Sequence, residues 1–387
     1  MCPHVPKQDK YLMAAFIHCP ELEQHPYPAG FPFSTSRAGE VRKTAYSMGL
    51  LSGPHRRQVA PMPAERGALL AFHTERYVEV LKDASAGSHR PEAFTMGLGT
   101  PDCPIFEGMY EYSALACMAS LKAAELVLSG QADAAFNPSG GLHHAMADRA
   151  SGFCYLNDAV LACMRLAAGG MRVLYLDIDA HHGDGVQAAF YDRRDVFTIS
   201  LHESGETLFP GSGFEDETGS GDGRGYSANI PLPMGTYDGA YLRAFRQAAL
   251  PLIGAYNPDA FVMQLGVDGL AGDPLTHMCL TNNACVEVIQ AVQTFRRPIL
   301  AVGGGGYNVA NTVRAWTLAW CMLCGQTGHT EDAGATRGGA QPLSPDRCAQ
   351  LRDPALVPDE PLRKRVDVAV DATIQKVKTN VFGFHGL

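Results

Sequence analysis

The chain has 387 residues, of which 46% are apolar and 18% charged, and its net charge is −9. This apolar fraction excludes an intrinsically disordered protein. The acidic balance and the lack of a long basic block argue against nucleic-acid binding, because phosphate contacts require clustered Lys and Arg.

The sequence predicts a cytoplasmic protein without a membrane segment. Its start, Met1–Lys10, is polar and carries no secretory signal, and its apolar stretches end well before the ~20 residues that a membrane helix needs. The 11 cysteines lack the regular spacing of a disulfide framework, so we expect reduced, buried thiols. Cys321 and Cys324 lie in an apolar helical pattern, which favours buried structural thiols over a redox or zinc pair.

Short apolar runs alternate with helical patterns along the chain. The predicted strands are Leu12–His18, Ala134–Asn137, Arg172–Asp179, Val196–His202, Ala260–Leu265 and Pro298–Val302. They are apolar on both faces, as in a parallel sheet covered by helices. The predicted helices are Glu111–Ser129, Asn157–Ala168 with Asn157 as N-cap, Tyr237–Tyr256, Asn283–Phe295 and Leu362–Val381. Gly325–Pro345 is polar and predicts an irregular excursion.

This alternation predicts an α/β fold with a central, mostly parallel sheet flanked by helices. No linker divides the chain into comparable halves, so we expect one domain over residues 1–387. Four unusual polar segments each follow a predicted strand. Because ligands bind beyond the carboxyl ends of parallel strands, the four segments predict a single site.

The first segment is YLDIDAHHGDGV, in which Asp177, Asp179 and His181 alternate at the end of a buried strand. Strand periodicity places the three side chains on one side. Buried carboxylates are costly unless they are paired or bind metal. Asp179 and His181 therefore predict a site for a divalent metal such as zinc.

The other segments are ambiguous when each is taken alone. In GGLHH, His143 and His144 suit ligands, bases or core residues, and Asp177 and Asp184 are available to fix their tautomers. Asp268 suits a third metal ligand or a turn cap.

The glycines of Gly303–Gly306 permit close backbone approach. Tyr307 follows them, either as a half-buried aromatic or as a hydrogen-bond donor to developing negative charge. Phe153 and Phe209 belong either to the core or to a pocket wall.

Seven motifs taken together resemble the zinc-dependent histone deacetylase superfamily, which includes acetoin-utilisation-type bacterial deacetylases. They are EGMYEYS, GGLHHAMADRASGFCYLNDAV, LDIDAHHGDGVQAAF, SLH, FPGSG, GDPL and VGGGGYN, in this order. The similarity covers about residues 12–325, leaves 326–387 as a C-terminal extension, and is greatest to the class I branch. It implies the arginase/deacetylase α/β fold and a single catalytic zinc.

The resemblance also implies a role for each matching residue. Asp179, His181 and Asp268 match the metal ligands, and His143 and His144 match the tandem catalytic histidines with Asp177 and Asp184 as their carboxylate partners. Tyr307 matches the transition-state tyrosine. The acyl-lysine tunnel walls match Gly152, Phe153, Phe209 and Leu275, the rim carboxylate matches Asp102, and an arginine near an inner cavity matches Arg37.

Two sites for a monovalent cation, K⁺ or Na⁺, are further implied. The first matches Asp177, Asp179, His181, Ser200 and Leu201, and the second matches Phe190, Arg193, Val196 and Tyr226. Two segments, His25–Ser34 and Arg337–Leu362, have no clear match and are expected to affect the pocket mouth or contacts in a homo-oligomer. Iron(II) is an alternative metal, because a two-Asp, one-His set is harder than most zinc shells.

The expected reaction is hydrolysis of the amide of an acylated lysine side chain, most simply an acetylated one. Deacylation of a small amine such as an acetylpolyamine is an alternative, although Leu275 at the position of an acidic gatekeeper favours lysine. A two-metal, arginase-like hydrolase would need more Asp and His ligands. A catalytically silent acyl-lysine-binding or scaffold protein predicts damage at the metal or tyrosine positions, and no matched catalytic position departs from the pattern.

Overall fold

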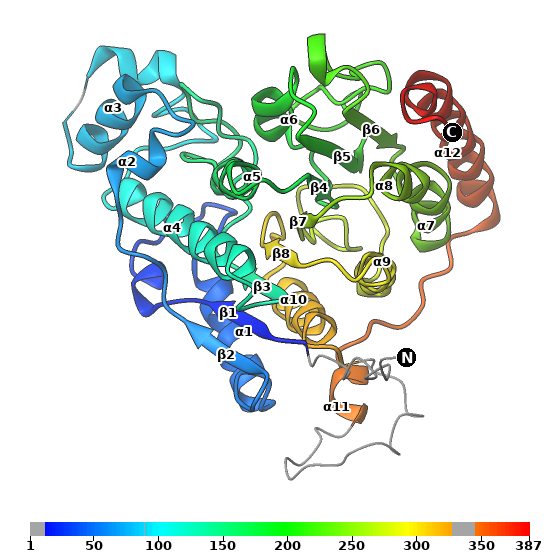
Figure 1. Ribbon diagram of the computed structural model, residues 1–387, viewed down its shortest axis with the longest axis horizontal. Helices are drawn as coiled ribbons and strands as arrows, with labels where there is room; N and C mark the ends of the chain where they lie inside the picture. The colour runs from blue at the N-terminus through cyan, green and yellow to red at the C-terminus, as the bar shows by residue number, and fades with distance from the viewer. Residues whose placement is uncertain (1–11, 89, 327–344) are drawn as a thin grey trace, which may run out of the picture.

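An eight-stranded parallel sheet organises the computed structural model, which describes residues 12–88, 90–326 and 345–387 (Figure 1). The strand order is β2-β1-β3-β8-β7-β4-β5-β6, and each neighbouring pair is parallel. The strands are β1 (Ala14–Ile17), β2 (Arg56–Val59), β3 (Ala134–Asn137), β4 (Val173–Asp177), β5 (Val196–Glu203), β6 (Ser227–Leu232), β7 (Ala260–Gln264) and β8 (Ile299–Val302).

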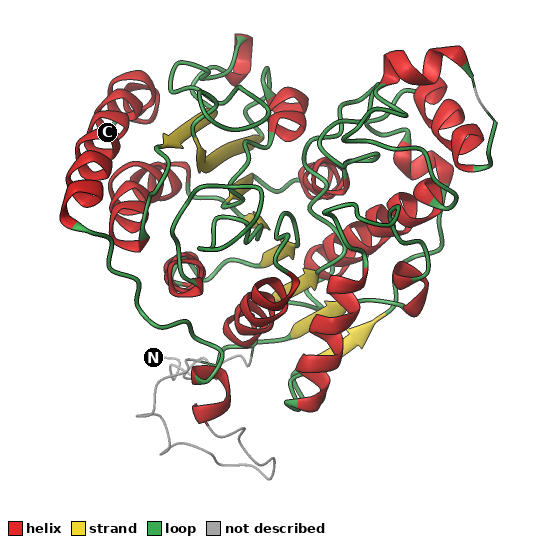
Figure 2. Ribbon diagram, turned by 180° about the vertical axis from the view of Figure 1, so that it is seen from behind, coloured by secondary structure: helices red, strands yellow, loops and turns green. Residues whose placement is uncertain are grey.

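Helices cover both faces of this sheet. They are α1 (Ser36–Ser47), α2 (Arg66–Leu69), α3 (Glu75–Ser85), α4 (Met109–Leu128), α5 (Asp158–Ala168), α6 (Asp184–Phe190), α7 (Asp238–Ala244), α8 (Leu250–Tyr256), α9 (Asn282–Gln293), α10 (Val309–Leu323), α11 (Pro345–Ala349) and α12 (Glu360–Val381). Helices α4, α5 and α6 lie on one face, and α7 to α10 lie on the other, as the two opposite views show (Figures 1 and 2).

Strand periodicity divides the core between these two faces. Phe16 and Phe136 point to the side of α1 and α10, whereas their neighbours Ile17 and Ala135 point to the side of α4 and α5. Side chains that alternate in this way are all apolar because both faces are buried. The predicted parallel sheet is therefore confirmed, and within the described residues it is wholly parallel.

The sequence did not predict β2 and β6, which form the two edges of the sheet. The β2 segment, RRQV, is polar and partly exposed, and the β6 segment, SANIPL, carries a proline. Edge strands tolerate charge and proline because they pair on one side only. These residues therefore lack the apolar run that identifies a central strand.

The helix predicted over Tyr237–Tyr256 is interrupted. A π-helical turn, η4 (Phe245–Ala249), separates α7 from α8. Pro251 lies at the start of α8, and proline lacks an N–H and crowds the preceding turn. A π-bulge is one way for a helix to accommodate such a residue.

The C-terminal helix is confirmed as α12, which begins two residues before the predicted Leu362. It lies along the β6 edge, where the hydroxyl of Thr373 donates a hydrogen bond of 3.0 Å to the carbonyl of Pro231 (Figure 1). Predictions for Met1–Lys10 and for most of Gly325–Pro345 lie outside the described residues. The single domain over 1–387 stays a prediction.

The prediction of reduced cysteines is wrong for one pair. Cys321 of α10 and Cys348 of α11 form a disulfide, because the fold brings these distant segments together. Cys321 therefore pairs with Cys348 rather than remaining a thiol beside Cys324, which is free. Within the described residues, no helix combines the length and the apolar character needed to cross a membrane.

Candidate active site

The four polar segments meet at the carboxyl ends of neighbouring strands. GGLHH follows β3, Asp179 and His181 follow β4, Asp268 follows β7, and the glycine-rich loop follows β8. These strands are consecutive in the sheet, in the order β3-β8-β7-β4. The predicted convergence on one site is therefore what the fold produces.

Asp179, His181 and Asp268 form a buried cluster with the composition of a metal site. Their potential ligand atoms all lie within 4.8 Å of one another. Nδ1 of His181 is 2.7 Å from Oδ2 of Asp268 and 3.2 Å from Oδ1 of Asp179. Two carboxylates and one imidazole are suitable ligands for Zn²⁺ or Fe²⁺, so the residues fit the implied metal.

The glycine-rich loop closes around this cluster. The amide of Gly305 donates to Oδ2 of Asp179 at 2.7 Å. A Cβ atom on Gly305 would lie only 2.1 Å from Oδ2 of Asp268, so a side chain would displace a carboxylate of the cluster. Glycine is therefore required here for close approach rather than for flexibility alone.

The cluster favours a positive charge at its centre. Burial lowers the pKa of His181, but Asp268 and Asp179 outweigh it and raise that pKa to about 10. Burial and the neighbouring Asp179 raise the pKa of Asp268 to about 7. A proton on the imidazole thus balances the carboxylates, and a metal ion would replace it on binding.

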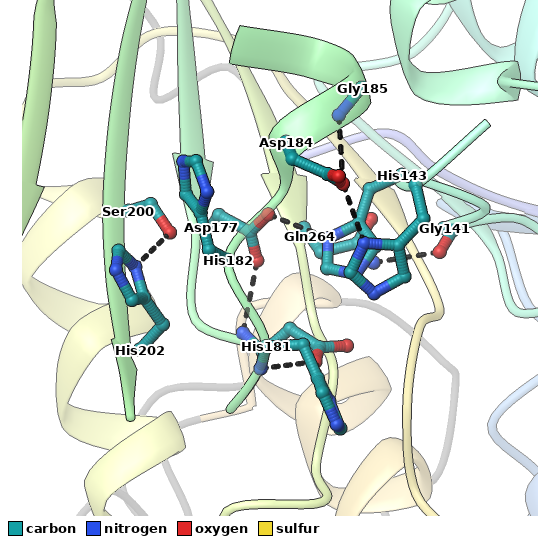
Figure 3. Close-up of polar contacts among 12 residues, drawn as sticks. Gly141, His143, Asp177, His181, His182, Asp184, Gly185, Ser200, His202 and Gln264 are labelled. Carbon is teal, nitrogen blue, oxygen red and sulfur yellow. Dashed lines mark hydrogen bonds and ion pairs between the residues drawn. The ribbon is translucent and has the colours of Figure 1, made fainter. Parts of the chain in front are cut away.

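Each tandem histidine is tied to a carboxylate. Nδ1 of His143 is 2.8 Å from Oδ2 of Asp177 (Figure 3). Nδ1 of His144 is 2.7 Å from Oδ1 of Asp184. The two Nε2 atoms lie 3.1 Å apart. Because each carboxylate accepts from Nδ1, the two Nε2 atoms are left facing each other, close enough to share a proton.

The two histidines have different proton affinities. Burial lowers the pKa of His143, but Asp177, Asp179 and Asp184 reverse this effect and raise it to about 9. Burial and the neighbouring charge on His143 lower the pKa of His144 to about 4. Near neutral pH the pair therefore carries a single positive charge, which is on His143, while His144 is neutral.

A pocket of about 470 Å³ leads to these groups. It is lined by Asp102, His144, Gly152, Phe153, His181, Leu208, Phe209, Leu275 and Tyr307. The structure thus brings together all the residues predicted for the tunnel and its rim, and adds Leu208. A larger hollow, of about 780 Å³, lies elsewhere, between α12 and the segment around Ser204 and Thr207.

Aromatic rings enclose the pocket. The ring of Phe209 lies 5.0 Å from that of His144, and the ring of Phe153 lies 5.7 Å from that of Tyr307. At Gly152, a Cβ atom would lie 2.4 Å from the His144 ring, so the wall has no room for a side chain there. Asp102 accepts a hydrogen bond of 3.0 Å from the amide of Gly152 and so fixes this wall to the rim.

The segment His25–Ser34 reaches the same wall. The hydroxyl of Tyr27 donates to the carbonyl of Phe153 at 2.6 Å. The ring of Phe31 meets the Phe153 ring edge-on at 4.9 Å. Phe153 has a φ of 68°, an uncommon value for a residue with a side chain, and these contacts support that conformation.

Arg37 is buried behind the glycine-rich loop. Its guanidinium donates to the carbonyl of Gly306 at 2.6 Å and to that of Gly304 at 3.1 Å. It lies over the rings of Phe33 and Trp316. Burial lowers its pKa, although arginine remains charged at any ordinary pH.

The residues predicted for monovalent cations fall into two groups, one shared between the end of β4 and the middle of β5 and one near the start of β5. Ser200 pairs in register with Asp177 of β4, and its hydroxyl is 2.7 Å from Nδ1 of His202 (Figure 3). The other group lies around the amino end of β5, which begins at Val196. Cation binding at either group stays a prediction.

Comparison with known proteins identifies the family. The model of the histone deacetylase domain matches residues 31–323, well over half of the chain. The chain belongs to the histone deacetylase family. This family member is therefore a hydrolase, with a candidate metal site buried in the fold.

Relatives with known structures or names support this assignment. The family member is 41% identical to histone deacetylase 8 of Xenopus tropicalis over 297 residues, which is 76% of this chain and 80% of the relative. It is 41% identical to acetoin utilization protein AcuC of Bacillus subtilis over 330 residues, 82% of this chain and 84% of the relative. The crystal structure of a histone deacetylase homologue from Aquifex aeolicus matches with a TM-score of 0.80 and 32% identity, over 95% of this chain and 100% of that one.

Several residues that shape the deacetylase-family site were not predicted from the sequence. The hydroxyl of Tyr175 donates to Oδ2 of Asp177 at 2.7 Å. The side-chain amide of Gln264 donates to the carbonyl of Gly141 at 2.8 Å (Figure 3). Asp158 is wholly buried and accepts from the amides of Gly141 and Leu142 at 2.9 and 2.8 Å. Tyr175 was detectable, because it lies two residues before Asp177 on the same strand face.

Proposed function

We propose that this protein hydrolyses the amide bond of an acylated, most simply acetylated, lysine side chain and releases acetate and the free amine. The observation that carries this proposal is one pocket of about 470 Å³ that reaches both the candidate metal cluster and a histidine pair carrying a single positive charge. An amide needs activation of its carbonyl, a base for water and an acid for the leaving amine. The pocket supplies groups suited to each need.

Asp179, His181 and Asp268 would hold Zn²⁺, with Fe²⁺ as the alternative. When bound, such a cation polarises an acyl carbonyl and lowers the pKa of a water molecule. The chain itself holds the ligands in place, since the amides of His181 and Ala180 donate to Asp179 and Asp268 at 2.9 Å each. These bonds fix the carboxylate oxygens before a metal arrives.

His144 acts as the general base in this proposal. It is neutral near pH 7, so its Nε2 can accept a proton from the attacking water. His143 keeps its proton because Asp177 stabilises the imidazolium, and it supplies positive charge beside the reacting centre. One of the two histidines then donates a proton to the leaving amine.

Tyr307 donates a hydrogen bond to the carbonyl oxygen and to the negative charge that develops on it. Its ring stands edge-on to His181 at 6.3 Å, beside the metal cluster. Burial raises the pKa of its hydroxyl well above the usual value, so the phenol keeps its proton near neutral pH and remains a donor. A fixed donor in a desolvated pocket stabilises charge more than water does.

The pocket walls favour a lysine stem over a small polyamine. Phe153, Phe209 and Leu275 surround it with apolar surface, which suits a chain of methylene groups. An acetylpolyamine keeps positive charge on its remaining amines, and these apolar side chains do not neutralise it. The non-enzymatic alternative is disfavoured, since the metal and tyrosine positions carry intact functional groups.

The direct test compares two substrates with metal-loaded protein. We expect a higher kcat/KM for an acetyl-lysine peptide than for acetylspermidine, measured by acetate release. A preference for acetylspermidine would replace the lysine proposal with the small-amine one. Hydrolysis of neither substrate would favour the catalytically silent binding protein. Replacement of Leu275 by Glu should shift the preference toward acetylspermidine.

We further propose that K⁺ or Na⁺ binds at the two groups of residues predicted for monovalent cations. We also propose that the protein acts in the cytoplasm. Under this proposal, dialysis against a buffer without K⁺ or Na⁺ lowers the melting temperature, and adding KCl restores it. Tetramethylammonium chloride at the same ionic strength separates specific binding from screening.

A further inference from the structure

Asp273 grips the backbone that carries Tyr307. Its Oδ2 accepts a hydrogen bond of 2.7 Å from the amide of Tyr307 and one of 3.3 Å from the amide of Asn308. Its Oδ1 accepts from the amide of Leu275 at 3.0 Å. One half-buried carboxylate therefore joins the tyrosine loop to the loop that supplies a pocket wall.

The peptide unit between Gly306 and Tyr307 is held at both of its polar ends. Arg37 donates to the carbonyl of Gly306 at 2.6 Å, and Asp273 accepts from the amide of Tyr307 at 2.7 Å. A positive group thus meets the negative end of the peptide dipole, and a negative group meets its positive end. Hydrogen bonds that involve a charged partner are stronger than neutral ones.

This peptide needs external support, because the segment before it is Gly303–Gly306. Gly304 and Gly306 have φ values of 134° and 139°, and a run of glycines has little stiffness of its own. After Tyr307, the chain is fixed at once, since the side chain of Asn308 caps α10. Within the described residues, the Tyr307 amide donates its hydrogen bond to Asp273.

We propose that Asp273 is a positioning residue for Tyr307, one that sets the direction of the phenol toward the acyl oxygen. The inference rests on the proposed function, in which the Tyr307 hydroxyl stabilises the transition state. Asp273 does not line the pocket of about 470 Å³, so its effect on the substrate passes through the segments whose amides it holds, and the shorter of these bonds is the one to Tyr307.

A double-mutant cycle tests this proposal with metal-loaded protein and an acetyl-lysine peptide. A small misplacement of a catalytic group costs up to about 100-fold in rate, so Asp273→Ala is expected to lower kcat by about 10- to 100-fold and to change KM little. In the Tyr307→Phe background, the same substitution is expected to cost almost nothing further, because the hydroxyl it positions is gone. Asp273→Asn keeps one acceptor oxygen and should recover part of the lost kcat.

A matched control is Asp259→Asn. Asp259 also accepts a hydrogen bond from a backbone N–H, that of Arg172, at 3.0 Å. It lies at the amino end of β7, whereas the site lies beyond the carboxyl ends of the strands. This variant should keep normal kcat. Crystal structures of the Asp273→Ala and wild-type proteins should differ in the position of the Tyr307 hydroxyl.

The possible results distinguish a failure of the positioning role of Asp273 from a failure of the proposed function. If Asp273→Ala lowers kcat as strongly in the Tyr307→Phe background as in the wild type, the positioning role is wrong while the proposed function stands. A large rise in KM with unchanged kcat, or an unmoved Tyr307 hydroxyl in the crystal, also contradicts it. If Tyr307→Phe alone keeps normal kcat, the role of Tyr307 in the proposed function fails, and the role of Asp273 fails with it.

Discussion

His143 and His144 are adjacent in the chain, yet their surroundings give them opposite proton affinities. Both are buried, which disfavours the charged form of each. His143 faces enough negative charge to overcome burial, whereas His144 faces the imidazolium of His143 as well as Asp184. An acid and a base can therefore be made from the same side chain, because the further charges around the two rings differ although each ring has one carboxylate partner.

This assignment predicts a pH profile with two limbs. Activity should fall below about pH 4, where His144 takes up a proton, and above about pH 9, where His143 loses one. Asp177→Asn removes a negative charge that raises the pKa of His143, so its alkaline limb should move to lower pH. Asp184→Asn should instead move the acidic limb to lower pH. Measured profiles of kcat/KM with unmoved limbs would contradict these roles.

The phenol of Tyr307 gives a second prediction at this scale. Loss of one such donor lowers turnover by about 10²–10³-fold in comparable sites. Tyr307→Phe should therefore lower kcat by this order and leave KM nearly unchanged. A hydroxamate inhibitor should still bind, which shows by calorimetry that the pocket is intact. Near-normal kcat in this variant would remove the tyrosine from the mechanism.

Among the site residues, prediction from sequence succeeded where a residue type was costly to bury. Asp177, Asp179 and His181 were recognisable because a buried strand ended in charge, and the resemblance to a known family supplied the partners on other strands. Asp158 and Asp273 were not recognised. Each accepts backbone amides from a segment distant in sequence, and a carboxylate in a turn or at a helix start has the same local pattern whatever it binds.

At the scale of elements, the central strands were predictable and the edges were not. Strands with helices on both faces are uniformly apolar, as in VLYLD of β4, whereas β2 is RRQV. The disulfide between Cys321 and Cys348 could not be predicted from the sequence either, since the pairing depends on α11 packing beside the end of α10.

The packing of α12 can be tested by a matched pair of substitutions. Ile374 is 1% exposed within a stripe that also contains Val366, Val370, Val377 and Val381, whereas Val368 is 72% exposed on the other side. Ile374→Ala should lower the free energy of unfolding by about 2–5 kcal/mol through lost burial and a cavity. Val368→Ala should change it by no more than about 0.5 kcal/mol. Equal effects in urea denaturation would contradict this packing.

At the scale of the whole molecule, the parallel sheet is what assembles the site. His143 and Tyr307 are far apart in sequence, yet both belong to this site. They meet because the carboxyl ends of four neighbouring strands lie side by side in the sheet. Helices on both faces then exclude water from the carboxylates and imidazoles, and this desolvation shifts their pKa values. The fold thus creates a strongly charged, dry cluster that a divalent cation can neutralise.

Because the fold gathers Asp179, His181 and Asp268 into one buried cluster, protein purified without added metal should already contain a divalent ion. We expect close to one Zn²⁺ or Fe²⁺ per chain by mass spectrometry of the acid-digested protein. Asp268→Ala removes one of the three ligands and should leave little bound metal. Asp259→Asn, at the amino end of β7 and away from the site, should leave the metal content unchanged. Equal metal in all three proteins would place the ion elsewhere.

The central claim is that one metal ion at Asp179, His181 and Asp268 enables deacylation. The most direct measurement is acetate release from an acetyl-lysine peptide as metal-free protein is titrated with Zn²⁺. The rate should rise in proportion to added metal and level off at one ion per chain. Full activity without metal, or no acetate release once the site is filled, would contradict the account.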